Sequence, residues 1–174
     1  MRRSVTFAVG SAIALAIAAG ASAAPKSASP CVAVLVASSE ETPKGGWGTK
    51  FSVTNTTDLT FTAVFLEGFT GEHLVELRVF TPRGFLYRSM AVPAVIEGSA
   101  SGTRKVPGYP HPVRVKGGAK FAYQGSTLWK VDLPFPLGGT DIGKNSLYGR
   151  WKVQAHLDGS QEPCADATTF RITP

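Results

Sequence analysis

Apolar and polar residues alternate most clearly over the stretch from Leu147 to Leu157. Side chains of a β-strand point alternately to its two faces, so this pattern predicts a strand with one buried and one solvated face. The Asp158-Gly159 pair then predicts a turn, and a second alternating strand follows over residues 169–173. The apolar parity of the first strand holds Leu147, Gly149, Trp151, Val153, Ala155 and Leu157, and the polar parity holds Arg150, Lys152, Gln154 and His156.

Strand patterns recur along most of the chain, and no helical period of useful length follows the apolar N-terminal segment. Residues 31–36 form a continuous apolar run, which is typical of a strand buried on both sides. A long connection rich in Gly, Ser and Pro spans residues 93–118. The pattern predicts an all-β chain, an antiparallel β-sandwich of roughly seven to nine short strands. The other strands are expected over 51–54, 59–66, 75–79, 85–92 and 129–133.

Two segments resemble bacterial immunoglobulin-like and macroglobulin-type β-sandwich modules. They are Leu77-x-Val79 with Pro82-x-Gly84, and Tyr148-Gly149-x-Trp151-x-Val153 with Phe170-x-Ile172. The resemblance implies an immunoglobulin-like sandwich that the late strand pair closes. Two features depart from that family. Its central disulfide joins the facing sheets in mid-domain, whereas Cys31 and Cys164 lie near the two ends of the domain, and the thioester segment of full macroglobulins has no counterpart here.

The N-terminus has the three parts of a secretory signal peptide. Arg2 and Arg3 precede an apolar run over residues 5–19, and Ala21-Ser22-Ala23 supplies the small residues of a cleavage site. Cutting after Ala23 removes 23 of the 174 residues and leaves 151, the size of one domain. We therefore expect a signal peptide over 1–23, a disordered lead over 24–30 and a single β-sandwich domain over 31–174. A retained membrane anchor is the alternative, but no stop-transfer pattern flanks the run.

Export sets the expectation for the two cysteines and for the charge. In an oxidising compartment Cys31 and Cys164 are expected to pair, and two free buried thiols are the alternative. Removing Arg2 and Arg3 from the eighteen Lys and Arg leaves sixteen against twelve Asp and Glu, a formal charge of +4. Outside the cytoplasm this modest excess favours contact with anionic glycans, lipid headgroups or other envelope polymers rather than with nucleic acid.

Catalytic and metal-binding patterns are missing from the sequence. His73, His111 and His156 are the three histidines, and none belongs to a serine-containing elbow or to a helix that carries two histidines one turn apart. The two cysteines have no further ligands at short spacing, so no metal and no cofactor are expected. His156, on the polar parity of its strand, is expected to be solvated. Two carboxylates brought together from distant positions would still permit glycoside hydrolysis.

The best candidate for binding is the basic segment from Arg104 to Lys116. Its prolines limit the entropy lost on binding, and its aromatic ring suits stacking on a sugar or insertion at an interface. Its basic groups suit phosphate or carboxylate partners. A solvated connector with a short edge strand is the alternative. The candidate binding residues are Arg104, Lys105, Tyr109, His111, Arg114 and Lys116.

A second basic row, Arg150, Lys152 and His156, lies on a strand and is therefore rigid. Such a row serves either as a floor for an anionic ligand or as a guard against edge aggregation. Trp47 could contribute to a sugar platform, whereas Trp129 and Trp151 fall on apolar parities and are expected to pack in the core.

Together these features predict a secreted or periplasmic protein that binds or supports other molecules without catalysis. Its partner is expected to be an anionic glycan, a lipid headgroup or another envelope protein. The alternative is a small secreted hydrolase acting on envelope polysaccharide, with its site assembled from loop residues. A deep pocket with two close carboxylates, or with Ser or Cys near His, would favour the enzyme. An open basic surface around Tyr109 would favour binding.

Overall fold

The computed structural model of the chain describes residues 29–39 and 46–174. The signal peptide expected over 1–23 and residues 24–28 of the expected lead lie outside the described residues. Ser29 and Pro30 already take part in the fold. The Ser29 hydroxyl donates to the Cys164 carbonyl, and the Leu66 N–H donates to the Pro30 carbonyl at 3.0 Å.

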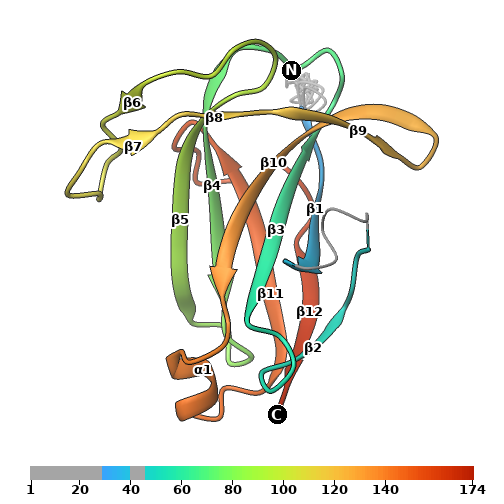
Figure 1. The fold of residues 1–174 in the computed structure, drawn as a ribbon, viewed down its shortest axis with the longest axis vertical. Coiled ribbons are helices and arrows are strands. Elements are labelled where there is room, and N and C mark those ends of the chain that lie inside the picture. Colours follow the sequence, from blue (N-terminus) through green and yellow to red (C-terminus); the bar gives the residue numbers. More distant parts are fainter. Residues whose placement is uncertain (1–28, 40–45) are drawn as a thin grey trace, which may run out of the picture.

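The described residues form an all-β protein, as the alternation of apolar and polar residues predicts (Figure 1). One sheet has four antiparallel strands, in the order β1 (Cys31–Ser38), β3 (Asp58–Phe65), β10 (Ser126–Pro136) and β9 (Ala119–Tyr123). The other has six strands, in the order β2 (Lys50–Ser52), β12 (Thr168–Thr173), β11 (Gly149–Leu157), β4 (Glu72–Phe80), β5 (Leu86–Val95) and β8 (Lys116–Gly117). A separate ribbon pairs β6 (Thr103–Arg104) with β7 (Val113–Arg114), and a short helix is α1 (Asp141–Lys144).

The six-stranded sheet is mixed, and this differs from the purely antiparallel sandwich that the sequence predicts. β2 runs parallel to β12, and β8 runs parallel to β5. Both added strands are short and lie at the two rims of the sheet. Parallel pairing needs a long connection, and the chain supplies one in each case: the segment from 96 to 115 separates β5 from β8, and most of the domain separates β2 from β12.

Side chains from both sheets form one hydrophobic core. The ring of Phe61 on β3 lies 5.5 Å from that of Phe170 on β12, and the ring of Tyr87 on β5 lies 6.1 Å from that of Phe135 on β10. Trp151 is fully buried, and its indole N–H donates to the Leu147 carbonyl at 2.9 Å. The apolar parity of the 147–157 stretch therefore faces the core, as predicted.

The predicted disulfide between Cys31 and Cys164 is present, and it closes the domain. Cys31 begins β1 and Cys164 lies between β11 and β12, with the two Cα atoms 5.4 Å apart. The Cys164 N–H also donates to the Ala155 carbonyl at 2.8 Å. The crosslink thus ties the first strand of one sheet to the segment that precedes the last strand of the other.

Candidate functional site

The basic segment forms a hairpin of its own beside the six-stranded sheet. β6 and β7 pair in antiparallel register, and Figure 1 shows this ribbon extending outward from the upper part of β5. A turn closes it, in which the Tyr109 N–H donates to the Val106 carbonyl at 3.1 Å. Val106, in the loop between the two strands, and Val115, directly after β7, are buried. The hairpin is therefore held at its tip and at its base, which a loose solvated connector would not be.

Tyr109 uses its hydroxyl to hold the hairpin against the sheet. The Ala91 N–H donates to the Tyr109 hydroxyl oxygen at 2.7 Å, on the side of β5 that faces away from β4. The Tyr109 side chain is 36% exposed. Its polar end thus serves the fold, and only part of its ring is available to a ligand.

Two of the predicted basic residues are likewise committed to internal contacts. The guanidinium of Arg104 forms a paired salt bridge with Glu72, with Nε 2.7 Å from Oε1 and the second nitrogen 2.8 Å from Oε2. Lys116 donates from Nζ to the main-chain carbonyl of Asp132 at 2.6 Å, which links β8 to β10. The charge of Arg104 is therefore largely neutralised, and Lys116 joins the rims of the two sheets.

The other three predicted residues, Lys105, His111 and Arg114, are exposed. No side-chain hydrogen bond or ion pair engages them within the part of the chain that the structure describes. Arg104 and Arg114 sit in consecutive cross-strand pairs, so their side chains leave the ribbon on opposite faces. The six candidates thus divide into three that anchor the hairpin and three that it presents to solvent.

His156 is buried, which corrects the expectation of a solvated residue. It is 2% exposed, Nδ1 lies 3.1 Å from the Ser160 carbonyl oxygen, and Nε2 has no hydrogen-bond partner. The segment after β11 folds back over the polar face of its own strand and covers the ring. Burial, and then the charge of Arg78, lower the pKa of His156. Its neutral form is therefore favoured.

The second basic row consequently does not form a uniform cationic floor. Lys152 places its ammonium 4.6 Å from the centre of the Phe80 ring, its cross-strand neighbour, and His156 is covered. Only Arg150 of the three is exposed. A cation–π contact stabilises a sheet face without any ligand, so this row serves the fold better than it serves a site.

His73 comes closest to a catalytic arrangement, yet its contacts leave it no free nitrogen. Nδ1 lies 2.9 Å from the Asp158 carboxylate, and Nε2 lies 3.0 Å from the Thr70 carbonyl oxygen. Burial lowers the pKa of His73, but the hydrogen bonds to Asp158 and Thr70 and the charge of Asp158 outweigh it and raise the pKa overall. A base that activates a nucleophile needs one unprotonated nitrogen directed at that group. This pair instead fastens the start of β4 to the turn after β11.

Residues 29–39 and 46–174 contain no cluster of three His, Cys, Asp or Glu side chains that could hold a metal ion. Among the same residues, no helix has the length and apolar character needed to cross a membrane.

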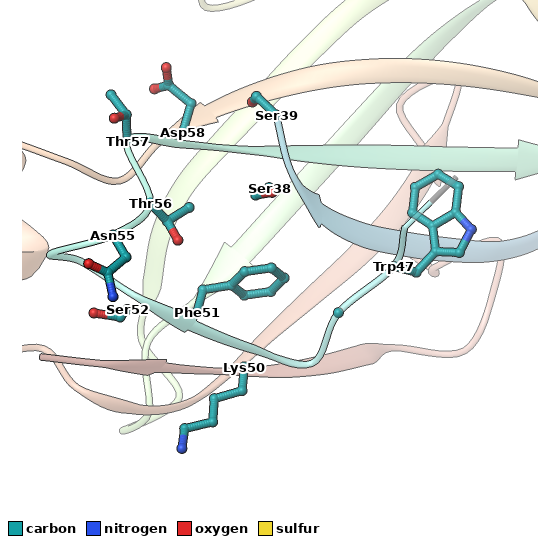
Figure 2. Close-up of a pocket in the computed structure, with 11 residues that line it drawn as sticks. Ser38, Ser39, Trp47, Lys50, Phe51, Ser52, Asn55, Thr56, Thr57 and Asp58 are labelled. Atoms are coloured by element: carbon teal, nitrogen blue, oxygen red, sulfur yellow. The ribbon is translucent and has the colours of Figure 1, made fainter. Parts of the chain in front are cut away.

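A polar cleft with a volume of about 560 Å³ lies beside β2, and no pattern in the sequence predicts it. Figure 2 shows the Phe51 ring at its centre, with Thr56 directed toward it and Lys50 directed away. Trp47 lies at its far end and packs edge-on against Phe121, at 6.3 Å between ring centres. Most of its wall consists of hydroxyl and amide groups, which are suited to hydrogen bonding of neutral polar molecules. The cleft is lined by Ser38, Ser39, Trp47, Gly48, Lys50, Phe51, Ser52, Asn55, Thr56, Thr57 and Asp58.

The hairpin and the polar cleft are thus two places on the described surface where polar groups gather. The hairpin differs from the cleft in holding exposed basic groups on an anchored element. Comparisons of this chain with protein-family models, with curated proteins and with solved structures find no significant match.

Proposed function

We propose that this protein is an exported, non-catalytic β-sandwich module of the immunoglobulin-like type that binds anionic polymers of the cell envelope or extracellular space. The β6–β7 hairpin is the binding element. One observation carries the proposal: Lys105, His111 and Arg114 are exposed without internal partners on a hairpin that Tyr109 and Arg104 fasten to the sheet.

Anchoring matters because binding loses less entropy when the groups are already in place. The hairpin presents two permanent cations and one histidine from a short segment, which suits a chain of repeated carboxylate or phosphate groups better than a single small anion. Such contacts are solvent-exposed, so each contributes little and salt screens them over about 8 Å at physiological ionic strength. We therefore expect weak binding that depends on several charges at once and falls as salt is raised.

The architecture supports the rest of the proposal. The two sheets share one hydrophobic core, and the β11–β12 pair lies inside the six-stranded sheet, which supports a sandwich architecture. The disulfide is compatible with an oxidising location outside the cytoplasm. Both features are common to many exported modules, so they bear on where the protein acts more than on what it binds.

The test compares binding of carboxylated glycans, phosphate-containing glycans and anionic lipid vesicles to three proteins. These are the native protein, the variant Lys105→Ala/His111→Ala/Arg114→Ala, and the control Lys144→Ala/Arg171→Ala, which removes the same number of permanent charges from exposed positions elsewhere. The hairpin variant should lose binding at low salt, and the control should retain it. Equal binding by the hairpin variant and the control would contradict the proposal. Polymers should also be recovered intact, and release of fragments would refute the non-catalytic part.

A further inference from the structure

The two sheets leave a groove on the side where β5 and β10 form their rims. It has a volume of about 330 Å³ and is lined mainly by apolar side chains, with basic residues among them. The hairpin residues that carry the proposed function do not line it. Its walls are Arg88, Met90, Ala91, Val92, Lys116, Leu133, Pro134 and Pro136.

The β5 rim of this groove is an unpaired strand edge. Within the described residues β5 pairs with β4 along its whole length, but with β8 only at Ala94 and Val95. Figure 1 shows the lower half of β5 at the left rim of the molecule. The Ala91 N–H points away from β4 toward Tyr109. Because strand residues alternate in direction, Ser89 also directs its main-chain N–H and carbonyl outward, and Ser89 is exposed.

The β10 rim is closed to a further strand. Pro134 and Pro136 are exposed at alternate positions on this rim and have no N–H to donate. The carbonyl of Asp132, the preceding position of the same parity, already accepts from Lys116. Prolines of this kind protect an edge from unwanted pairing. β5 has one proline of its own, Pro93, but it lies next to the part that β8 covers. An added strand can therefore pair with β5 around Ser89, whereas β10 offers it no N–H at Pro134 or Pro136.

The charges of the groove select an acidic occupant. Arg88 is exposed and has no ion pair within the described part of the chain. Lys116 contacts the main-chain carbonyl of Asp132 and not its carboxylate. That carboxylate instead accepts from Lys130 at 2.7 Å and from Thr62 at 2.5 Å, on the other face of β10. The Glu76 carboxylate, which accepts from the Ser89 hydroxyl at 2.6 Å, is paired with Arg78 at 2.8 Å. A ligand entering from the β5 side therefore meets the unpaired charge of Arg88.

We propose that the free edge of β5 binds an extended acidic segment of a partner protein, which adds to the sheet as a strand. Its main chain pairs with the outward groups of Ser89, its apolar side chains enter the groove beside Met90 and Leu133, and a carboxylate meets Arg88. Strand addition takes affinity from main-chain hydrogen bonds and specificity from alternate side chains. An acyl chain with an anionic head would match the charge and the apolar wall, but it would leave the edge N–H of Ser89 without a partner.

A substitution at Tyr109 distinguishes strand addition from other modes of binding. Its hydroxyl oxygen accepts the Ala91 N–H in the place where a carbonyl of an added strand would accept it. Tyr109→Phe removes that competitor and leaves the ring. If a strand adds at this edge, the substitution should tighten binding by about fivefold, the equivalent of one ordinary hydrogen bond. A ligand that used the Tyr109 hydroxyl directly would instead bind more weakly.

The experiment uses a fluorescent, end-blocked peptide of alternating valine and threonine with a single glutamate, about eight residues long so that it spans the free part of β5. With one carboxylate it offers the basic hairpin no chain of repeated anionic groups. Saturable anisotropy changes are expected with the native protein. The same peptide N-methylated at every second residue should bind at least tenfold more weakly, because it cannot form the main-chain hydrogen bonds on one side. Arg88→Glu should weaken binding by a similar factor, and the control Arg150→Glu, an exposed reversal on β11, should not.

Three outcomes would overturn the proposal: no saturable binding, equal affinity of the methylated peptide, or weaker binding by Tyr109→Phe. Displacement of the peptide by dodecanoate together with equal binding of the methylated form would assign the groove to an acyl anion instead. The hairpin variant Lys105→Ala/His111→Ala/Arg114→Ala should keep its affinity for the peptide. The polymer-binding test and the peptide-binding test can therefore fail independently of each other.

Discussion

At the scale of single residues, the fold favours protonation of one histidine and opposes protonation of another. Both nitrogens of His73 face acceptor oxygens, of Asp158 and of Thr70, so the protonated ring satisfies both contacts at once. His156 has one nitrogen near a carbonyl and one without any partner, in a buried site beside Arg78. Protonation is therefore favoured at His73, near the start of β4, and opposed at His156, beneath the segment after β11.

His73 should make the domain less stable as the solution becomes alkaline. Its pKa is raised above the ordinary value of about 6.5, so the folded state holds its proton more tightly than the unfolded state. The stabilisation is complete below pH 6.5 or so and is lost as pH rises through the raised pKa. Urea unfolding of the native protein and of His73→Gln, measured between about pH 5 and 9, should show this decline only in the native protein. Parallel curves would contradict the assignment.

His156 should have the reverse effect. Burial and Arg78 lower its pKa, so the unfolded state binds a proton first as pH falls. Its contribution is complete above about pH 6.5 and is lost progressively as pH falls below that value. His156→Gln removes the titrating group, and its stability should change less between about pH 7 and 5 than that of the native protein. A steeper acid loss in the variant would show that another group is responsible.

At the scale of elements, the sequence predicts strands well where one face is buried and one is solvated. β11 and β12 follow their predicted alternation, apart from the covered His156, because one face of each strand packs on the core. β9 was missed, since only two of its five residues are half-buried and it pairs on one side only. β8 was missed because two residues carry no period. Neither its pairing with β5 nor the mixed character of the sheet has a local signal.

The same reasoning explains which parts of the candidate site were predictable. The exposed basic groups of Lys105 and Arg114 could be read from the sequence, because charged residues in a Pro-rich and Gly-rich segment are commonly solvated. The contacts of Tyr109 with Ala91 and of Arg104 with Glu72 join residues far apart in the chain. The burial of His156 likewise depends on a segment that folds back over its strand. The alternation of apolar and polar residues within the strand does not reveal that another segment covers it.

The junction of β8 with β5 gives a prediction at this scale. The Gly118 N–H donates to the Val95 carbonyl at 2.7 Å, and a Cβ at this position would collide with the Ile96 carbonyl oxygen. Gly118→Ala must therefore shift main chain, and we expect it to lower the free energy of unfolding by roughly 1–3 kcal/mol. Gly68→Ala is the matched control, because a Cβ there would meet nothing within 4 Å. Denaturant unfolding that gave equal stabilities for the two variants would contradict the close approach.

At the scale of the whole molecule, the disulfide is a crosslink between the two sheets added to a core that is already extensive. Rings from β3, β5, β10 and β12 contact one another between the sheets, and these ring contacts do not involve Cys31 or Cys164. The bond spans 133 residues, so nearly all of the described chain lies within the loop that it closes. Its main effect is therefore expected on the unfolded chain, whose freedom it restricts, and less on the arrangement of the sheets.

Removing the bond should accordingly weaken the domain without unfolding it. Cys31→Ser/Cys164→Ser is expected to lose about 2–5 kcal/mol of unfolding free energy, the usual range for a native disulfide. Guanidinium unfolding of the native protein with and without reductant should give a similar loss, while reductant should leave the double variant unchanged. Because the hairpin is held by Tyr109 and Arg104 rather than by the disulfide, polymer binding should survive in the double variant at low temperature. Two alkylatable thiols in the non-reduced protein, or an unchanged midpoint on reduction, would show that the crosslink does not form.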